Sequence, residues 1–146
     1  MLNKTDRRKF IRIDQQNTCR FEYVSYSKHG IITSQLIQVV TKNLSNSGIL
    51  FTTKHPPKLS SIILLSVDQI KAAQLKEIKK KAFIFKGKIL GKVVRVEESG
   101  LGCEVGVAFV SRDESLAQEL SGLIIKNRVR SLLKFALGLF IFQAVV

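Results

Sequence analysis

The sequence predicts an all-β domain with a C-terminal helix, in which six antiparallel strands close into a barrel behind a flexible N-terminal arm. Three observations predict this class. Short segments of alternating apolar and polar residues recur along the middle of the chain, turn-forming residues separate them, and no helices alternate with them. We therefore expect residues 1–17 to form the arm, residues 18–111 the barrel and residues 112–146 the helix.

Six segments have the length and the apolar pattern of strands. They cover residues 18–27, 31–42, 49–53, 61–67, 82–97 and 103–110. Most of them alternate as half-buried strands do, whereas the fourth is a short continuous apolar run. The fifth contains Gly87 and Gly91, and glycine inside a strand indicates a bulge or a sharp bend. A small barrel needs such bends at its corners.

Residues that favour turns or interrupt strands lie between these segments. Residues 28–30 and 99–102 contain glycine and are expected to be tight turns. Pro56 and Pro57 end the third strand, because proline cannot donate a hydrogen bond to a ladder. Residues 43–48 are expected to form a loop, since asparagine, serine and glycine compete with strand pairing and tolerate positive φ.

Helical structure is expected in two places. Residues 69–81 have the composition of a helical turn or of a long loop. Nearer the C-terminus, Asp113 and Glu114 stand where the helix dipole favours acids, at the start of a helix. Apolar residues then recur at helical spacing, at Leu116, Leu120, Leu123 and Ile124. We expect this helix to run past Leu133.

The chain is strongly basic. Its 146 residues carry a formal net charge of +13 and a pI near 10.1, although the 45% hydrophobic and 24% charged contents are ordinary for a globular domain. Such a charge favours an anionic partner, either a nucleotide, a nucleic acid or an acidic membrane surface. Charge alone leaves all three open.

Residues that could support catalysis or bind a metal are not grouped in this sequence. Cys19 and Cys103 lack metal-ligand spacing, so we expect two reduced, partly buried strand residues. His29 and His55 lie in predicted loops without a partner at the spacing of a metal site or a catalytic triad. We expect no enzyme, because no nucleophile, base or glycine-rich phosphate loop stands in a suitable context. The first ten residues lack the apolar stretch of a signal peptide, which predicts a cytoplasmic protein.

Two short motifs carry the chemistry of a nucleotide site. Arg8 and Arg12 lie four residues apart on the expected arm, and the planar guanidinium fork binds a phosphate or the edge of a guanine bidentately. Asn43 and Ser45 supply short polar groups at a strand edge, and Gly48 lets the backbone turn closely beneath a ligand. We expect the arm to be disordered without ligand and to fold over it on binding.

These motifs, as Arg8-Lys9-Phe10-Ile11-Arg12 followed by Asn43-Leu44-Ser45-Asn46-Ser47-Gly48, resemble the RxxxR and D/NxSxxG motifs of PilZ domains. The resemblance covers most of residues 7–111 in the same order and separation. PilZ domains bind cyclic di-GMP, so the resemblance implies a receptor for this ligand with Arg8, Arg12, Asn43, Ser45 and Gly48 as site residues and no other cofactor.

The resemblance extends to stoichiometry and output. An arginine directly before the RxxxR motif tends in this family to go with two stacked cyclic di-GMP molecules, which implies the same role for Arg7. It also implies a stand-alone receptor that changes conformation on binding and signals to an unidentified protein effector in motility, adhesion or exopolysaccharide control.

The main alternative is a basic β-barrel that binds RNA or single-stranded DNA. Such barrels interleave basic and aromatic residues on an exposed sheet face, so that bases stack on the rings. Here Phe83, Phe85 and Phe109 are expected to face inward, and tryptophan is absent. The aromatic pattern therefore favours the cyclic nucleotide over a nucleic acid.

The C-terminal end is almost entirely apolar. Among residues 132–146 only Lys134 and Gln143 are polar, and fifteen helical residues span roughly 22 Å, short of the roughly 30 Å hydrocarbon core. We expect burial against the barrel or against a second copy in a homodimer. The other alternative is a peripheral membrane contact supported by nearby basic residues, which would make the chain a membrane-apposed, PilZ-like interaction module.

Overall fold

The structure of the protein, a computed structural model, describes residues 18–145, together with their side chains except those of residues 134 and 138–145. The expected arm, with Arg7, Arg8 and Arg12, lies outside the described residues.

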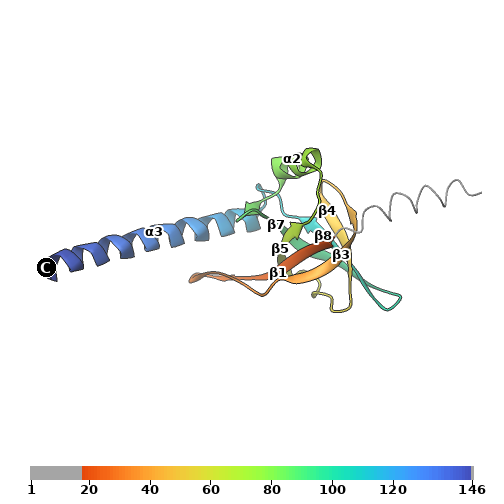
Figure 1. The fold of residues 1–146 in the computed structure, drawn as a ribbon, viewed down its shortest axis with the longest axis horizontal. Coiled ribbons are helices and arrows are strands. Elements are labelled where there is room, and N and C mark those ends of the chain that lie inside the picture. The colour runs from red at the N-terminus through yellow and green to blue at the C-terminus, as the bar shows by residue number, and fades with distance from the viewer. Residues whose placement is uncertain (1–17, 146) are drawn as a thin grey trace, which may run out of the picture.

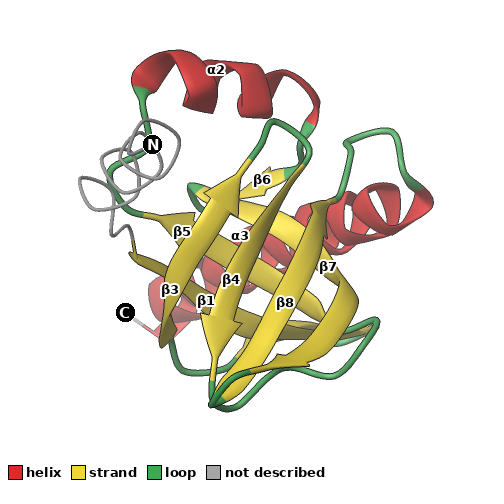
Figure 2. Cartoon of the chain, turned by 90° about the vertical axis from the view of Figure 1, so that its right-hand side faces the viewer, coloured by secondary structure: helices red, strands yellow, loops and turns green. Residues whose placement is uncertain are grey.

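Six strands form a closed antiparallel barrel, as predicted (Figure 2). Around the barrel they are β1 (Thr18–Ser27), β3 (Ile37–Leu44), β4 (Gly48–Thr53), β8 (Gly102–Phe109), β7 (Lys88–Ser99) and β5 (Ile62–Val67). Pairing between β5 and β1 closes the barrel, so no edge of the six-stranded circuit is left open.

Three shorter elements are added to this barrel. Strand β2 (Gly30–Thr33) forms a hairpin with the end of β1, and β6 (Ile84–Phe85) pairs with the start of β7. Helix α2 (Ala72–Lys81) occupies the segment for which a helical turn or a loop was predicted. Its Ile78 is fully buried and belongs to the core of the barrel.

Two predicted strands are each divided in the structure. The segment 31–42 is β2 and β3 with a break at residues 34–36, because Tyr23 donates its N–H to the Ser34 hydroxyl (2.8 Å) instead of to a strand carbonyl. The segment 82–97 turns tightly at Lys86 and Gly87, whose φ angles are +51° and +77°. Gly87 therefore marks a hairpin turn between β6 and β7 and not a bulge within a strand.

Gly91 has a packing role. A Cβ at this position would lie 2.5 Å from Cγ1 of Val107, so the absence of a side chain leaves room for the neighbouring strand inside the barrel. The bulge in β7 falls between Val93 and Arg95 instead.

Two separate apolar clusters stabilise the fold. The first fills the barrel and includes the stacked rings of Phe21 and Phe51, both fully buried. The second lies outside the barrel, between its wall and helix α3 (Ser115–Val145), and joins Leu64 and Leu90 to Leu120. The cysteines are free, Cys19 buried and Cys103 partly buried, as predicted. Burial raises the pKa of the Cys19 thiol.

Helix α3 runs past Leu133, as predicted, and leaves the barrel after its first few turns (Figure 1). The prediction that its apolar end is buried against the barrel is wrong for the described side chains. Leu132 is 68% exposed and Leu133 58% exposed, because only the first part of the helix lies over the barrel wall. No helix in residues 18–145 combines the length and the apolarity that a membrane crossing requires.

Candidate functional site

One outer face of the barrel, formed by β3, β4, β8 and β7, carries most of the predicted site residues that the structure describes. We call it the open face, because α3 packs on the other side of the barrel (Figure 2). One cross-strand row on this face consists of Asn43, Leu50, Gly106 and Arg95, each paired with the next. Three strand spacings separate its ends, which places Asn43 about 14 Å from Arg95.

Two bulges bring the ends of this row to the outside. In β3 the register shifts between Thr41 and Asn43, so Asn43 is exposed and the following Leu44 packs against the core. In β7 the shift between Val93 and Arg95 has the same effect, exposing Arg95 while Val96 packs inward. A bulge reverses the alternation of a strand and re-aims the side chains that follow. Both bulges here place a polar side chain on the open face.

The middle of the open face carries small or partly buried side chains. Gly106 has no side chain, Ala108 has a methyl group, and Leu50 is partly buried between them and β3. This part of the sheet forms a low floor between the polar groups at its two sides. Such a floor lets a planar ligand approach the sheet closely.

The turn from β3 to β4 borders the floor and is fixed by its own hydrogen bonds. Ser45 donates its N–H to the carbonyl of Gly48 (2.9 Å), and its hydroxyl accepts the N–H groups of Gly48 (3.2 Å) and Ser47 (3.3 Å). The neighbouring strand holds the turn in place, since Phe109 donates its N–H to the Ser47 carbonyl (2.9 Å). The predicted loop is therefore shorter than expected, with β3 continuing to Leu44.

Gly48 is required by strand packing. A Cβ there would lie 2.4 Å from the carbonyl oxygen of Val107, inside any possible contact distance. The structure therefore gives Gly48 a role in letting β4 pair closely with β8, and its place beneath a ligand stays a prediction.

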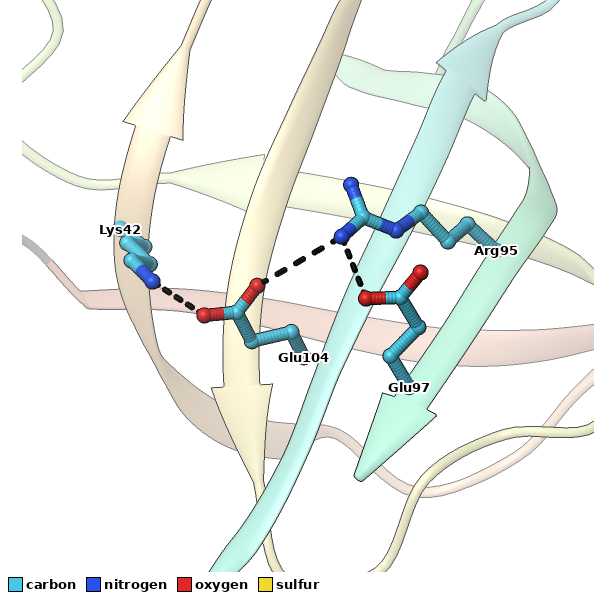
Figure 3. Close-up of polar contacts among 4 residues, drawn as sticks. All are labelled: Lys42, Arg95, Glu97 and Glu104. Atoms are coloured by element: carbon cyan, nitrogen blue, oxygen red, sulfur yellow. Dashed lines mark hydrogen bonds and ion pairs between the residues drawn. The ribbon is translucent and has the colours of Figure 1, made fainter. Parts of the chain in front are cut away.

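An ion-pair network crosses the open face (Figure 3). Glu104 lies between Lys42, with which it pairs directly, and Arg95, whose Nη2 is 4.0 Å from its Oε2. The same Nη2 donates to Oε2 of Glu97 at 2.6 Å. This pairing lowers the pKa of Glu97 and raises that of Arg95. The guanidinium of Arg95 therefore lies between two acids beside the floor.

The structure brings together Asn43, Ser45 and Gly48 of the predicted site. Sequence reasoning missed Arg95 and Lys42 as neighbours of these residues. The signal that could have found Arg95 is the doublet Val93-Val94 before it, because two adjacent valines followed by an Arg-Val pair break the alternation of the strand.

A cavity between α2 and the barrel is the other candidate for a ligand site. Its volume is about 150 Å³, and the ion pair between Arg20 and Asp68 (2.9 Å) lies at its lining. Pockets for small organic ligands usually enclose about 300 Å³ or more, so this cavity is too small for a dinucleotide. Within the described residues, no group of acids, histidines and cysteines is arranged to hold a metal ion.

Comparison with known proteins identifies the family. The PilZ domain matches residues 6–126, which is most of the chain and includes residues 6–17 of the arm as well as the barrel. A search of curated proteins found no match, and a search of solved structures found none either. PilZ domains are non-catalytic receptors of cyclic di-GMP. The barrel, the two motifs and this match together show that the chain belongs to the PilZ domain family.

Proposed function

We propose that the chain binds cyclic di-GMP on the open face and that the bound form has a different affinity for a protein effector. The observation that supports this most strongly is the row from Asn43 to Arg95, in which the partly buried Leu50 and the bare Gly106 separate two exposed polar groups. Cyclic di-GMP offers complementary chemistry, because it combines two phosphate charges with two planar guanines.

The arginines of the arm can reach this face. Arg12 stands six residues before Thr18, and six extended residues span at most about 20 Å. Thr18 is paired with Val40, three residues from Asn43 on the same strand. A segment of that length therefore suffices to bring the Arg12 guanidinium over the floor. Arg8 lies four residues further along the arm.

Each polar group has a separate role in the proposal. Arg8 and Arg12 bind phosphate or the O6 and N7 edge of guanine, and Arg95 offers a third fork from the opposite side of the floor. The exposed Asn43 amide can donate and accept hydrogen bonds at a base edge. Ser45 acts mainly by stabilising the turn. Its hydroxyl donates to the Gly48 carbonyl and accepts the N–H groups of Ser47 and Gly48, so the turn uses both its proton and its lone pairs.

The arm also bears on the number of ligands and on signalling. Arg7 directly precedes the RxxxR motif, and we propose that it supports binding of a second, stacked cyclic di-GMP. A ligand transmits a signal only through a difference in affinity between two states of the protein. We propose that closure of the arm over the ligand is that difference, read by a cytoplasmic effector of motility, adhesion or exopolysaccharide control.

Binding of RNA or single-stranded DNA is supported less well. Phe83 and Phe85 belong to the cluster beneath α3, and Phe109 packs against the barrel core. The open-face row contains no aromatic residue on which a base could stack. Competition in a filter-binding assay separates the two functions, since an oligonucleotide should not displace cyclic di-GMP.

Titration calorimetry of the whole chain with cyclic di-GMP tests the proposal. Arg8→Ala and Arg12→Ala should each weaken binding by about 10- to 100-fold, because a hydrogen bond to a charged group contributes about 1.5–3 kcal/mol. Arg7→Ala should lower the stoichiometry from two ligands towards one. Arg20→Ala, which removes an exposed arginine paired with Asp68, is the matched control and should bind as the unmodified chain does.

Unchanged affinity in both the Arg8 and Arg12 variants would exclude this site. An unchanged stoichiometry in the Arg7 variant would exclude only the role of that residue.

A further inference from the structure

The second half of the described part of α3 exposes a continuous apolar face. Near the barrel, Ala117 and Leu120 are buried and Ile124 is partly buried against the wall. Beyond them the large apolar side chains are open to solvent. They are Ile125 (61% exposed), Val129 (49%), Leu132 (68%), Leu133 (58%), Phe135 (68%) and Leu137 (60%). An exposed apolar patch of this kind on a folded domain indicates an interaction surface.

This face does not continue the one that packs on the barrel. The stripe of Ala117, Leu120 and Ile124 continues at helical spacing into Asn127 and Ser131, which are polar. Asn127 lies over the β1–β2 hairpin, where its Nδ2 is 2.8 Å from the point that a Cβ on Gly30 would occupy. Past this contact the apolar residues lie on another side of the helix, so the barrel is not their partner.

The charges of this segment favour an anionic partner. No acidic residue follows Glu119, whereas Lys126, Arg128 and Arg130 are all exposed and flank the exposed apolar face. A second copy of the chain would place these cations against an identical set with no acid in the segment to neutralise them. An anionic surface would neutralise all three cations.

We propose that residues 125–137 of α3 lie on the anionic surface of a membrane. The apolar face enters the boundary between headgroups and acyl chains, and the three cations contact headgroup phosphates while their aliphatic stems pack beside it. Basic residues near such a surface each strengthen binding roughly fivefold. The inference rests on α3 alone and stands whether or not the open face binds cyclic di-GMP.

Co-sedimentation of the whole chain with two kinds of vesicle tests the inference. One kind contains phosphatidylcholine alone, and the other contains phosphatidylcholine with phosphatidylglycerol. We expect stronger binding to the anionic vesicles and a loss of binding as salt is raised. The variant Lys126→Gln/Arg128→Gln/Arg130→Gln should bind them about a hundredfold more weakly.

A matched control removes the same charge elsewhere. Lys76→Gln/Lys79→Gln/Lys81→Gln neutralises three exposed lysines of α2 and should retain most of the binding. Leu132→Gln/Leu133→Gln should also lose vesicle binding while leaving the thermal unfolding midpoint unchanged, because glutamine and leucine have similar helix propensities and both sites are exposed.

Three results would overturn the inference. They are equal binding to neutral and anionic vesicles, no binding to either kind, and a dimer in light scattering that Leu132→Gln/Leu133→Gln converts to a monomer. The last result would assign the face to a second copy of the chain.

Discussion

The barrel has two outer faces that differ in what covers them. On one face Leu64 and Leu90 point outward and are buried beneath Leu120 of α3. On the open face no helix covers the row of Asn43, Leu50, Gly106 and Arg95, and the polar residues at its two ends, Asn43 and Arg95, are exposed. Both faces belong to the same closed circuit of hydrogen-bonded strands. The side chains that alternate outward therefore determine which face packs a helix and which remains available for a ligand.

Strand β7 shows how one segment serves both faces. Its Leu90 packs beneath α3, and five residues later its Arg95 stands on the open face. The bulge between Val93 and Arg95 separates the two parts. With regular alternation Arg95 would point into the barrel, so the bulge allows a polar open face on a strand that also supports the core.

The covered face should matter most for stability. Leu120→Ala removes a fully buried side chain and should lower the free energy of unfolding by about 2–5 kcal/mol. Leu50→Ala, on the open face and only partly buried, should cost about 1 kcal/mol. Urea denaturation of both variants measures the difference, and equal losses would contradict the assignment of the two faces.

Gly48 should affect stability although it belongs to the ligand motif. Gly48→Ala places a Cβ against the Val107 carbonyl, which should destabilise the protein by about 1–3 kcal/mol through disturbed pairing of β4 and β8. Gly122→Ala is the control, since a Cβ there meets nothing within 4 Å and should stabilise the helix by about 0.5–1 kcal/mol. A Gly48→Ala variant as stable as the unmodified chain would show that the close approach can relax.

The open face should matter for binding and little for stability. Asn43→Ala and Arg95→Ala should each weaken cyclic di-GMP binding about tenfold or more while leaving the thermal unfolding midpoint nearly unchanged, because both side chains are exposed. Calorimetry and a thermal melt on the same sample measure both effects. If Arg95→Ala binds normally while Asn43→Ala does not, Arg95 belongs only to the ion-pair network with Glu97 and Glu104.

The smallest expected effect concerns the ion pairs of the two faces. Glu22 is 7% exposed and pairs with Lys88, and this hydrogen bond lowers its pKa in the folded state. Its contribution is therefore complete above the ordinary pKa near 4.5 and is lost as the pH falls through the lower folded value. Glu22→Gln should flatten the fall in stability below pH 4.5, whereas Glu97→Gln should flatten it much less, because solvent screens the exposed pair of Glu97 with Arg95. Identical pH profiles would contradict this difference.

Much of the barrel could be predicted because alternation and turn residues are local signals. The hairpin at residues 99–102 follows directly from them, and the C-terminal helix follows from apolar residues at helical spacing, which is also a local signal. The divisions of the second and fifth segments could not be predicted in this way. They depend on the Ser34 hydroxyl replacing a strand acceptor and on positive φ at Lys86. Both features are set by the tertiary structure and not by the local sequence pattern.

Part of the candidate site could also be predicted from the sequence. Asn43, Ser45 and Gly48 form a recognisable string, and the structure places them together at one turn. Arg95 comes from a strand fifty residues later and reaches the same row only through pairing of β4, β8 and β7. A linear motif cannot report such a neighbour.

Calorimetric titration of the whole chain with cyclic di-GMP, in parallel with cyclic di-AMP, tests the central claim most directly. We predict saturable binding of cyclic di-GMP with two ligands per chain and much weaker binding of the adenine analogue, because arginine forks match O6 and N7 of guanine. Absence of heat with cyclic di-GMP, or equal binding of both dinucleotides, would contradict the assignment of the open face as its receptor site.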